Sequence, residues 1–256
     1  MWGAIIGDIV GSVYEWNRIK TKDFEFFSPR CHYTDDSVCT AAVADILLHD
    51  LPVAKTLQTW CRRHPGRGYG GWFRRWIRRD SPEPYNSFGN GAAMRVSPAA
   101  FLNRDDLSAA LAASDRVTAV THDHPEGMKR ARATVHTIWL ALNGEDPAAI
   151  RATAATKYDY DLSRTVDEIR PGYAFNETCQ GTVPESITCA LESASFEDAV
   201  RNAVSLGGDS DTVAAIAGPI AEALHGIPGE LKATARERYL VDAPEIVAVL
   251  EEMYGA

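Results

Sequence analysis

Hydrophobic residues recur along this chain at intervals of three and four, which is the spacing of amphipathic helices. The clearest such segment follows Asp211 and ends at Gly226 and Pro228, residue types that commonly terminate helices. A second segment runs from Pro125 to Leu142 before Gly144. Because no regularly spaced β-branched runs alternate with these segments, we predict an all-α fold. Alanine-rich stretches with the same pattern cover Ala41–Leu48, Ala109–Val120, Ala148–Ala155 and Ala190–Val204.

Three longer stretches lack this pattern and are rich in glycine, proline and aromatic residues: about 66–71, 81–91 and 170–184. Their composition is not that of flexible linkers, so we expect these loops to form the walls of a site. The chain has 256 residues, 45% of them hydrophobic, which is enough for one sizeable core. We therefore expect a single domain over residues 1–256.

Composition also bears on location and partners. No continuous apolar stretch reaches the ~18 residues of a membrane span, and the N-terminus lacks the regions of a signal peptide. Five widely spaced cysteines with no Cys-x-x-Cys pair suit a reducing compartment. We expect a soluble, cytoplasmic protein that has no membrane partner.

A formal net charge of −9 argues against general affinity for nucleic acids. The exception is the segment Arg62–Arg79, in which seven arginines are interleaved with Tyr69, Trp72, Phe73 and Trp76. A nucleic-acid target could bind there and is kept as an alternative that is not favoured. The favoured interpretation is a solvated amphipathic helix that follows a glycine-rich loop.

Two short acidic motifs carry the candidate chemistry: Thr34-Asp35-Asp36-Ser37 and Gly207-Gly208-Asp209-Ser210-Asp211-Thr212. Each opens a segment predicted to be helical. Asp, Ser and Thr are common N-cap residues, so one such motif alone would be read as a helix cap. Two motifs with crowded carboxylates and hydroxyls favour a shared cation instead. Oxygen ligands without cysteine favour Mg²⁺, Mn²⁺ or Ca²⁺ over zinc.

The segment Gly7–Glu15 places Asp8 and Glu15 on either side of glycines. Asp8 is as compatible with close helix packing as with chemistry. Glu15 lies between Tyr14 and Trp16, an environment that can raise the pKa of a carboxyl group and prepare it for acid–base work.

Two further segments suggest ligand binding. Ser87–Arg95 contains Gly-Asn-Gly and resembles a phosphate cradle that leads into a helix N-terminus. The His-x-His pair at 122–124 could hold zinc, but no third ligand follows at a suitable spacing. We favour a helix-end turn there.

Taken in order, the segments Gly7–Glu15, Thr34–Ser37, Gly89–Arg95 and Gly207–Thr212 resemble the motifs of the ADP-ribosylglycohydrolase family. The resemblance spans residues 3 to about 228. It implies a compact all-α fold of orthogonally packed helices around a central cleft with two Mg²⁺ or Mn²⁺ ions. It also implies hydrolysis of the glycosidic bond between ADP-ribose and a modified target, with ADP-ribose as product.

The resemblance assigns roles by position. Glu15 would gate the site and assist proton transfer, and Asp35 and Asp36 would be catalytic as well as metal-binding. The metal ligands would be Thr34, Asp35, Asp36, Asp209, Asp211 and Thr212. The substrate-binding residues would be Ser87, Gly89, Asn90, Gly91, Met94 and His122.

One position bears on the branch of the family. Nitrogenase-type members carry aspartate where this chain has Ser87, so the chain looks more like the serine-type or poly(ADP-ribose)-cleaving branch. The cleaved linkage is left open among arginine, serine, a nucleic-acid base and a small conjugate. A two-metal nucleotide phosphoesterase and a catalytically inactive ADP-ribose-binding protein are the alternative functions.

Overall fold

The computed structural model describes residues 1–255, which form helices and no strand. The all-α prediction is therefore confirmed. Two short helical turns accompany the α-helices: a 3₁₀ turn, η1 (Asn90–Ala92), and a π-helical turn, η2 (Ala235–Tyr239). The α-helices are α1 (Trp2–Gly11), α2 (Asp35–Leu48), α3 (Val53–Arg63), α4 (Gly71–Ile77), α5 (Ser97–Leu102), α6 (Leu107–Thr118), α7 (Pro125–Leu142), α8 (Pro147–Tyr158), α9 (Val166–Ile169), α10 (Cys179–Leu191), α11 (Phe196–Ser205), α12 (Ser210–His225), α13 (Gly229–Thr234) and α14 (Pro244–Gly255).

The strongest periodic segments fold as predicted. Helix α12 ends at His225, and Gly226 follows with a φ of +69°, a conformation that glycine adopts without strain. Helix α7 covers Pro125–Leu142, the predicted range. Both acidic motifs open helices, because Asp35 begins α2 and Ser210 begins α12.

One predicted helix is wrong. The alanine-rich stretch 190–204 is divided between α10 and α11 by a break at 192–195. Ser195 ends the break as the N-cap of α11, where its hydroxyl accepts a hydrogen bond from the Asp198 N–H. The loop predicted at 170–184 is also shorter than expected, since α10 begins at Cys179 and includes Pro184.

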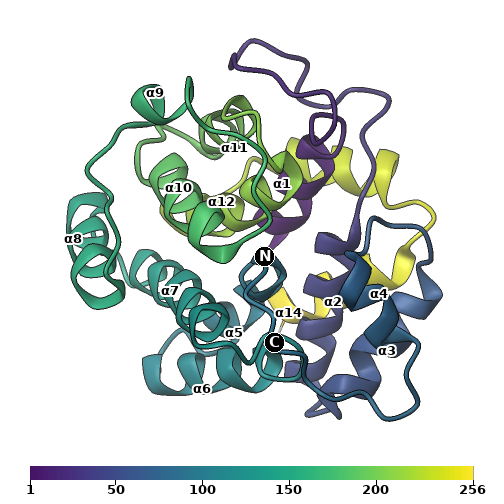
Figure 1. The fold of residues 1–256 in the computed structure, drawn as a ribbon. Coiled ribbons are helices and arrows are strands. Elements are labelled where there is room, and N and C mark those ends of the chain that lie inside the picture. Colours follow the sequence, from purple (N-terminus) through teal and green to yellow (C-terminus); the bar gives the residue numbers. More distant parts are fainter. Residues whose placement is uncertain (256) are drawn as a thin grey trace.

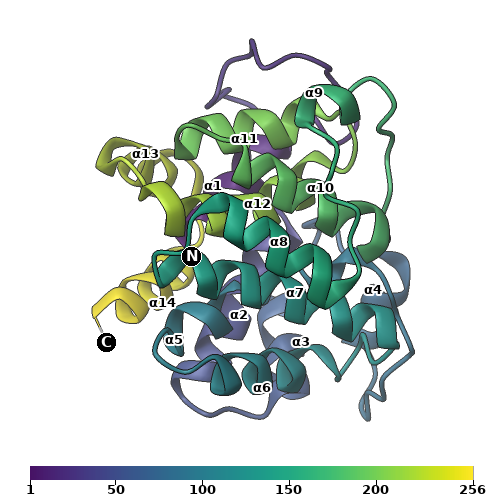
Figure 2. The same ribbon diagram turned by 90° about the vertical axis from the view of Figure 1, so that its left-hand side faces the viewer.

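Helix α12 forms the centre of the molecule, where α1 packs along it and α10 and α11 flank it (Figures 1 and 2). Every residue from Ser210 to Glu222 is buried, in keeping with a helix covered on all sides. Helices α2, α3, α5 and α7 complete the core around this layer. Within residues 1–255, no helix is both long enough and apolar enough to cross a membrane.

Glycines on α1 let it approach α12 very closely. A Cβ atom added to Gly7 would lie 2.2 Å from the carbonyl oxygen of Ala214, and one added to Gly11 would lie 2.5 Å from the Cα atom of Asp211. Neither position has room for a side chain. The close contact brings Asp8, which follows Gly7, beside the start of α12, where the second acidic motif lies.

Candidate metal and substrate site

A cavity of about 580 Å³ opens where the starts of α2 and α12 meet three loops. Its volume falls within the usual range for small-molecule sites, about 300–1,000 Å³. Every residue that the sequence assigned to the site contributes to its lining. These residues are Glu15, Thr34, Asp35, Asp36, Ser87, Gly89, Asn90, Gly91, Met94, His122, Asp209, Asp211 and Thr212.

Asp8 organises the first acidic motif from outside it. Its Oδ2 atom accepts hydrogen bonds from the backbone N–H groups of Thr34 (2.9 Å) and Ser37 (3.0 Å), and also from the Ser37 hydroxyl. Its Oδ1 atom accepts one from the Thr34 hydroxyl at 2.6 Å. Asp8 is fully buried, and these bonds occupy most of its lone pairs. It therefore fixes the start of α2 and adds a negative charge behind the cavity.

N-capping does not account for the carboxylates of Asp35, Asp36 and Asp209. In the first motif Thr34 is the N-cap and accepts the Asp36 N–H at 3.3 Å, so neither aspartate is needed for capping. In the second motif Asp209 occupies the N-cap position but makes no capping hydrogen bond. Its Oδ2 atom instead accepts a hydrogen bond from the Asn90 side-chain amide at 2.6 Å.

The hydrogen bonding of Asp36 is incomplete in a way that suits a cation ligand. Its Oδ2 atom accepts a weak hydrogen bond from the Thr212 hydroxyl (3.3 Å). The Thr34 hydroxyl lies 3.5 Å from the same atom, but its single proton is donated to Asp8. Its Oδ1 atom is buried and has no hydrogen-bond partner among residues 1–255. A buried carboxylate oxygen without a partner is costly, and a bound cation would satisfy it.

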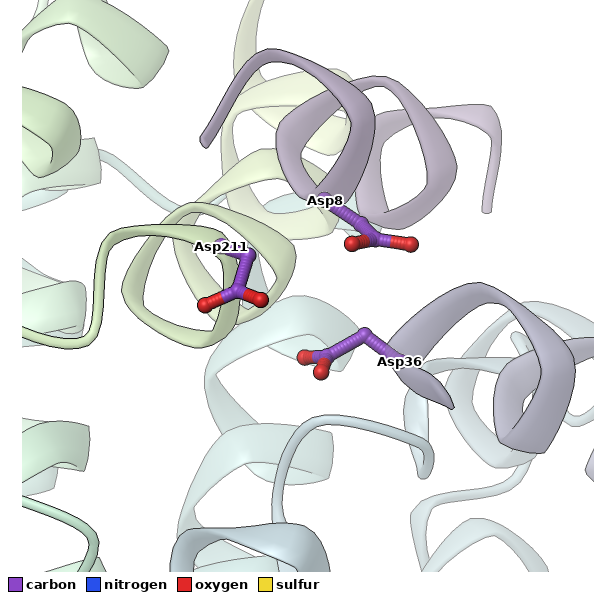
Figure 3. A group of neighbouring side chains, drawn as sticks. All are labelled: Asp8, Asp36 and Asp211. Carbon is purple, nitrogen blue, oxygen red and sulfur yellow. The ribbon is translucent and has the colours of Figure 1, made fainter. Parts of the chain in front are cut away.

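The acidic side chains form two groups that share Asp211. In the first, carboxylate oxygens of Asp8, Asp36 and Asp211 lie within 4.8 Å of one another. They converge from α1, α2 and α12 (Figure 3). In the second, oxygens of Glu15, Asp209 and Asp211 satisfy the same limit. All these ligand atoms are hard oxygens, which suits Mg²⁺ or Mn²⁺.

The carboxyl groups perturb one another strongly. Burial, followed by repulsion from Asp211, raises the pKa of Asp8 to about 6. The same two causes raise the pKa of Glu15 to about 7 and that of Asp36 well above its usual value. Burial and the charge of Asp211 also raise the pKa of Asp209 well above the ordinary range. A cation among these groups would reverse the effect, because it favours the ionised forms.

Asp35 is a member of neither acidic group. It is half-buried at the first position of α2 and faces the loop that carries Gly68, where an added Cβ would lie 3.0 Å from its Oδ1 atom. Burial raises the pKa of Asp35 well above its usual value. The roles assigned to Asp35 stay predictions, and its position suits contact with a ligand at the cavity wall.

The Gly-Asn-Gly segment forms the opposite wall. Ser87 accepts the Gly89 N–H at 3.2 Å, and the Asn90 N–H donates to the Glu177 carbonyl at 2.8 Å. The expected helix N-terminus is only the short turn η1. Asn90 also joins this wall to the acidic groups through its bond to Asp209.

The zinc alternative at the His-x-His pair does not fit the structure. His124 caps α7, where its Nδ1 atom accepts the Glu126 N–H at 3.1 Å. Asp123 accepts the Asn86 N–H at 2.7 Å. Of the two histidines in the pair, His122 alone contributes to the cavity lining. The helix-end turn favoured from the sequence is therefore confirmed.

Most of the arginine-rich segment is also solvated, as favoured. On α4 the side chains of Phe73, Trp76 and Ile77 are buried while Arg74 and Arg75 are exposed. Trp72 is the exception among the aromatic residues. It is 66% exposed and lies at the cavity lining, with the Arg75 guanidinium 5.1 Å from its ring centroid.

Several lining residues were missed by the sequence reasoning. Trp16, Tyr85, Arg95 and Glu177 contribute to the cavity, and Asp8 supports it from behind. Trp16 directly follows the Gly7–Glu15 segment and Arg95 ends the Ser87–Arg95 segment, so their positions in the sequence could have suggested a place at the site. Tyr85 and Glu177 lie in the loops predicted to form site walls, but no local pattern marks them.

Comparisons with known proteins show what this chain is similar to. A sequence model of the ADP-ribosylglycohydrolase family matches residues 1–255. The chain is 27% identical to the ADP-ribosylarginine hydrolase Tri1 of Pseudomonas putida (strain GB-1), across 89% of this chain and 70% of that protein. It is 29% identical to Tri1 of Serratia proteamaculans (strain 568), across 59% of this chain and 42% of that protein.

Two further similarities extend over most of the chain. The ADP-ribosylhydrolase ARH3 of Mus musculus is 26% identical, across 88% of this chain and 82% of ARH3. A solved structure described as an ADP-ribosylglycohydrolase-related protein complex shares the fold with a TM-score of 0.72 and 23% identity, covering 98% of this chain and 95% of its own. The chain belongs to the ADP-ribosylglycohydrolase family and is an enzyme that hydrolyses glycosidic linkages to ADP-ribose.

Proposed function

We propose that this enzyme removes ADP-ribose from modified protein side chains and uses two Mg²⁺ or Mn²⁺ ions held beside Asp36 and Asp211. The buried, unpartnered Oδ1 atom of Asp36 is the observation that carries the metal proposal. Asp211 would be shared between the ions, because it alone belongs to both groups. We propose Thr34, Asp35, Asp209 and Thr212 as the remaining ligands, with Asp8 holding the start of α2 in place.

Divalent ions bound there would orient the ribose hydroxyls and lower the pKa of a water molecule. The chain's own residues would do the rest. The carboxylates facing the cavity would stabilise the positive charge that develops on the ribose as the glycosidic bond breaks. Ser87, Gly89, Gly91, Met94 and His122 would hold ADP-ribose along the loop wall.

Glu15 is proposed to carry a proton. Its carboxylate lies with Asp209 and Asp211 and contributes to the cavity lining. Its position at the cavity lining would let it accept a proton and return it during the reaction. Trp16, which is 75% exposed beside it, would lie at the edge of the site where the modified target enters.

Two observations bear on which ADP-ribosyl linkage the enzyme cleaves, and they favour different side chains. The name of the Tri1 relatives favours ADP-ribosylarginine. Ser87 and the segment Gly11–Glu15, which reads Gly-Ser-Val-Tyr-Glu, favour ADP-ribosylserine through their resemblance to the serine-type branch. We propose a protein side chain as target in either case, in the cytoplasm, with residues 1–256 acting as one domain. Five cysteines without a disulfide among them support the reducing location.

The test is a set of defined substrates: an ADP-ribosylarginine peptide, an ADP-ribosylserine peptide and free ADP-ribose, each with Mg²⁺, Mn²⁺ or chelator. Metal-dependent release of intact ADP-ribose from a peptide supports the proposal, and the faster peptide identifies the linkage. Release of AMP would instead indicate a phosphoesterase. Binding of ADP-ribose without turnover of either peptide would contradict the proposed protein substrates.

A further inference from the structure

Arg95 is a buried cation without an ion-pair partner. Its side chain is 1% exposed, and no Asp or Glu of residues 1–255 forms an ion pair with it. Its Nη2 atom donates to the Thr121 hydroxyl at 2.6 Å and to the Val117 carbonyl at 3.3 Å. Its Nε atom has no acceptor among residues 1–255. Burying such a charge is costly unless an anion compensates it. Arg95 also contributes to the cavity lining, so a bound anion could supply that compensation.

The Thr121 hydroxyl connects Arg95 to His122 through two hydrogen bonds. Thr121 is fully buried, and its Oγ1 atom lies 2.7 Å from His122 Nδ1. Arginine can only donate, so the oxygen accepts from Arg95 and its single proton must point elsewhere. The hydroxyl therefore donates to Nδ1, which leaves the imidazole proton on Nε2. In the Nδ1–H tautomer the buried Thr121 hydroxyl proton would have no acceptor, at a cost of about 1–3 kcal/mol.

The charge of His122 is settled by the same surroundings. Burial, followed by the positive charge of Arg95, lowers the pKa of His122 well below its usual value. The imidazole is therefore neutral at physiological pH and has one N–H group to donate.

That N–H group faces the glycine wall of the cavity. A Cβ added to Gly91 would lie 3.1 Å from His122 Nε2, and one added to Gly89 would lie 3.7 Å from it. The glycines thus keep the space beside Nε2 open. An oxygen atom of a ligand that lies along this loop can therefore reach Nε2. A side chain at position 91 would block that approach.

We propose that Arg95 and Thr121 are positioning residues that hold His122 as its Nε2–H tautomer, so that the imidazole donates a hydrogen bond to a phosphoryl oxygen of ADP-ribose. This inference rests on the proposed binding of ADP-ribose along the Gly89–Gly91 loop. The diphosphate would also offset the buried charge of Arg95. The relay makes the wall selective for an acceptor, because a neutral imidazole fixed in this tautomer cannot accept a hydrogen bond from the ligand at Nε2.

The test combines a spectroscopic measurement with a matched set of variants. Long-range ¹H–¹⁵N correlation of the histidine rings, with His122→Gln used for assignment, reports the tautomer directly. Thr121→Val keeps the side-chain shape but removes the hydroxyl, and Thr121→Ser restores it. Thr118→Val is the control, because Thr118 is a buried threonine nearby whose hydroxyl has no hydrogen-bond partner among residues 1–255.

In the wild type we expect the Nε2–H tautomer, and in Thr121→Val a mixture of the two tautomers. The dissociation constant for ADP-ribose, measured by calorimetry, should rise about 5- to 50-fold in Thr121→Val, as expected for weakening one hydrogen bond to a charged acceptor. Thr121→Ser and Thr118→Val should each stay within about twofold of wild type, because neither loses a hydrogen bond of the relay.

Two results would overturn the relay. One is a wild-type His122 protonated on Nδ1, and the other is equal ADP-ribose affinity in the wild type and a folded Thr121→Val variant. The tautomer measurement needs no substrate, so either result concerns the relay alone when the wild type binds ADP-ribose. A wild type with the expected tautomer but no affinity for ADP-ribose would overturn the proposed function and with it the phosphoryl acceptor.

Discussion

Asp211 is the carboxylate that both acidic groups share, so replacing it should have opposite effects with and without metal. Asp211→Asn keeps the size of the side chain and an oxygen that can accept the Thr212 N–H, a bond of 2.9 Å in the wild type. It removes one negative charge, and the new amide can donate to a neighbouring carboxylate. We expect the metal-free variant to be more stable than the metal-free wild type.

The size of this gain follows from the spacing of the carboxylates. Two ionised oxygens at the 4.8 Å limit of the group would repel by about 3 kcal/mol at an effective dielectric constant of about 20. Partial protonation at neutral pH reduces this repulsion, so a net gain of about 1–3 kcal/mol is expected. For a chain of this size that corresponds to a rise in melting temperature of roughly 3–10 °C.

Metal should reverse the order. A ligand at about 100 times its dissociation constant stabilises the folded state by about 2.7 kcal/mol, so saturating Mg²⁺ or Mn²⁺ should raise the melting temperature of the wild type. Asp211→Asn should lose most of that rise together with turnover, and Asp36→Asn should do the same. Calorimetric melting in chelator and in metal measures both effects. Asp80→Asn, at an exposed position, is the control.

We therefore expect Asp211→Asn to be more stable than the wild type in chelator and less stable than the wild type in metal. A variant less stable than wild type in chelator would show that repulsion does not dominate the metal-free site. A full metal-induced rise in either site variant, or full activity, would refute the shared metal site.

The pH dependence of the metal-free wild type provides an independent check on the same repulsion. The folded-state pKa values of Asp8 and Glu15 are raised to about 6 and about 7, above their unfolded values. The folded state therefore binds more protons than the unfolded state, and its stability falls as pH rises through these values. In chelator, we expect a higher melting temperature at about pH 5.5 than at about pH 8 from these groups, and a smaller difference in Asp211→Asn.

Three further predictions concern other parts of the molecule. Glu15→Gln should lower kcat by about 10²–10⁴-fold and change ADP-ribose affinity little; normal turnover with poor binding would make Glu15 a binding residue instead. Gly7→Ala should destabilise the fold by at least about 1–3 kcal/mol in denaturant titrations, because its Cβ would meet the α12 backbone, whereas Gly229→Ala, which has open space, should be neutral. Replacing both Arg74 and Arg75 by Ala should spare activity on a minimal ADP-ribosyl substrate and reduce it on a macromolecular one; equal rates on both at low and moderate salt would leave α4 as a solvated face.

The sequence predicted the features that depend on neighbouring residues. The period of apolar positions and the flanking Gly226 located α12, and Pro125 located the start of α7. The candidate site residues, which line one cavity, came from short motifs of unusual composition and from the family that these motifs resemble. The break at 192–195 was missed because the helical period of 190–204 continues across it, while the N-cap at Ser195 is a weaker signal.

Contacts between distant segments were beyond such reasoning. Asp8 was recognised as a candidate, but nothing in Gly7–Glu15 shows that its carboxylate holds the start of α2, 26 residues away. The pairing of Arg95 with Thr121 depends in the same way on how two loops meet. These are hydrogen bonds that only the folded chain creates, and they determine which polar groups are satisfied and which are left for a ligand.

The packing of α1 on α12 explains why stability and activity should be linked in this enzyme. Glycines at 3, 7 and 11 bring α1 against the α12 backbone, which places Asp8 and Asp211 together at one end of that contact. The repulsion between these carboxylates opposes the packing that produces it. The metal-free fold therefore holds its acidic groups in place through the buried apolar surface of α1 and α12, and a bound cation would replace that opposition with attraction. A mutation that loosens the glycine contact should weaken metal binding even though it touches no ligand, because it lets the two helices separate and the acidic group spread.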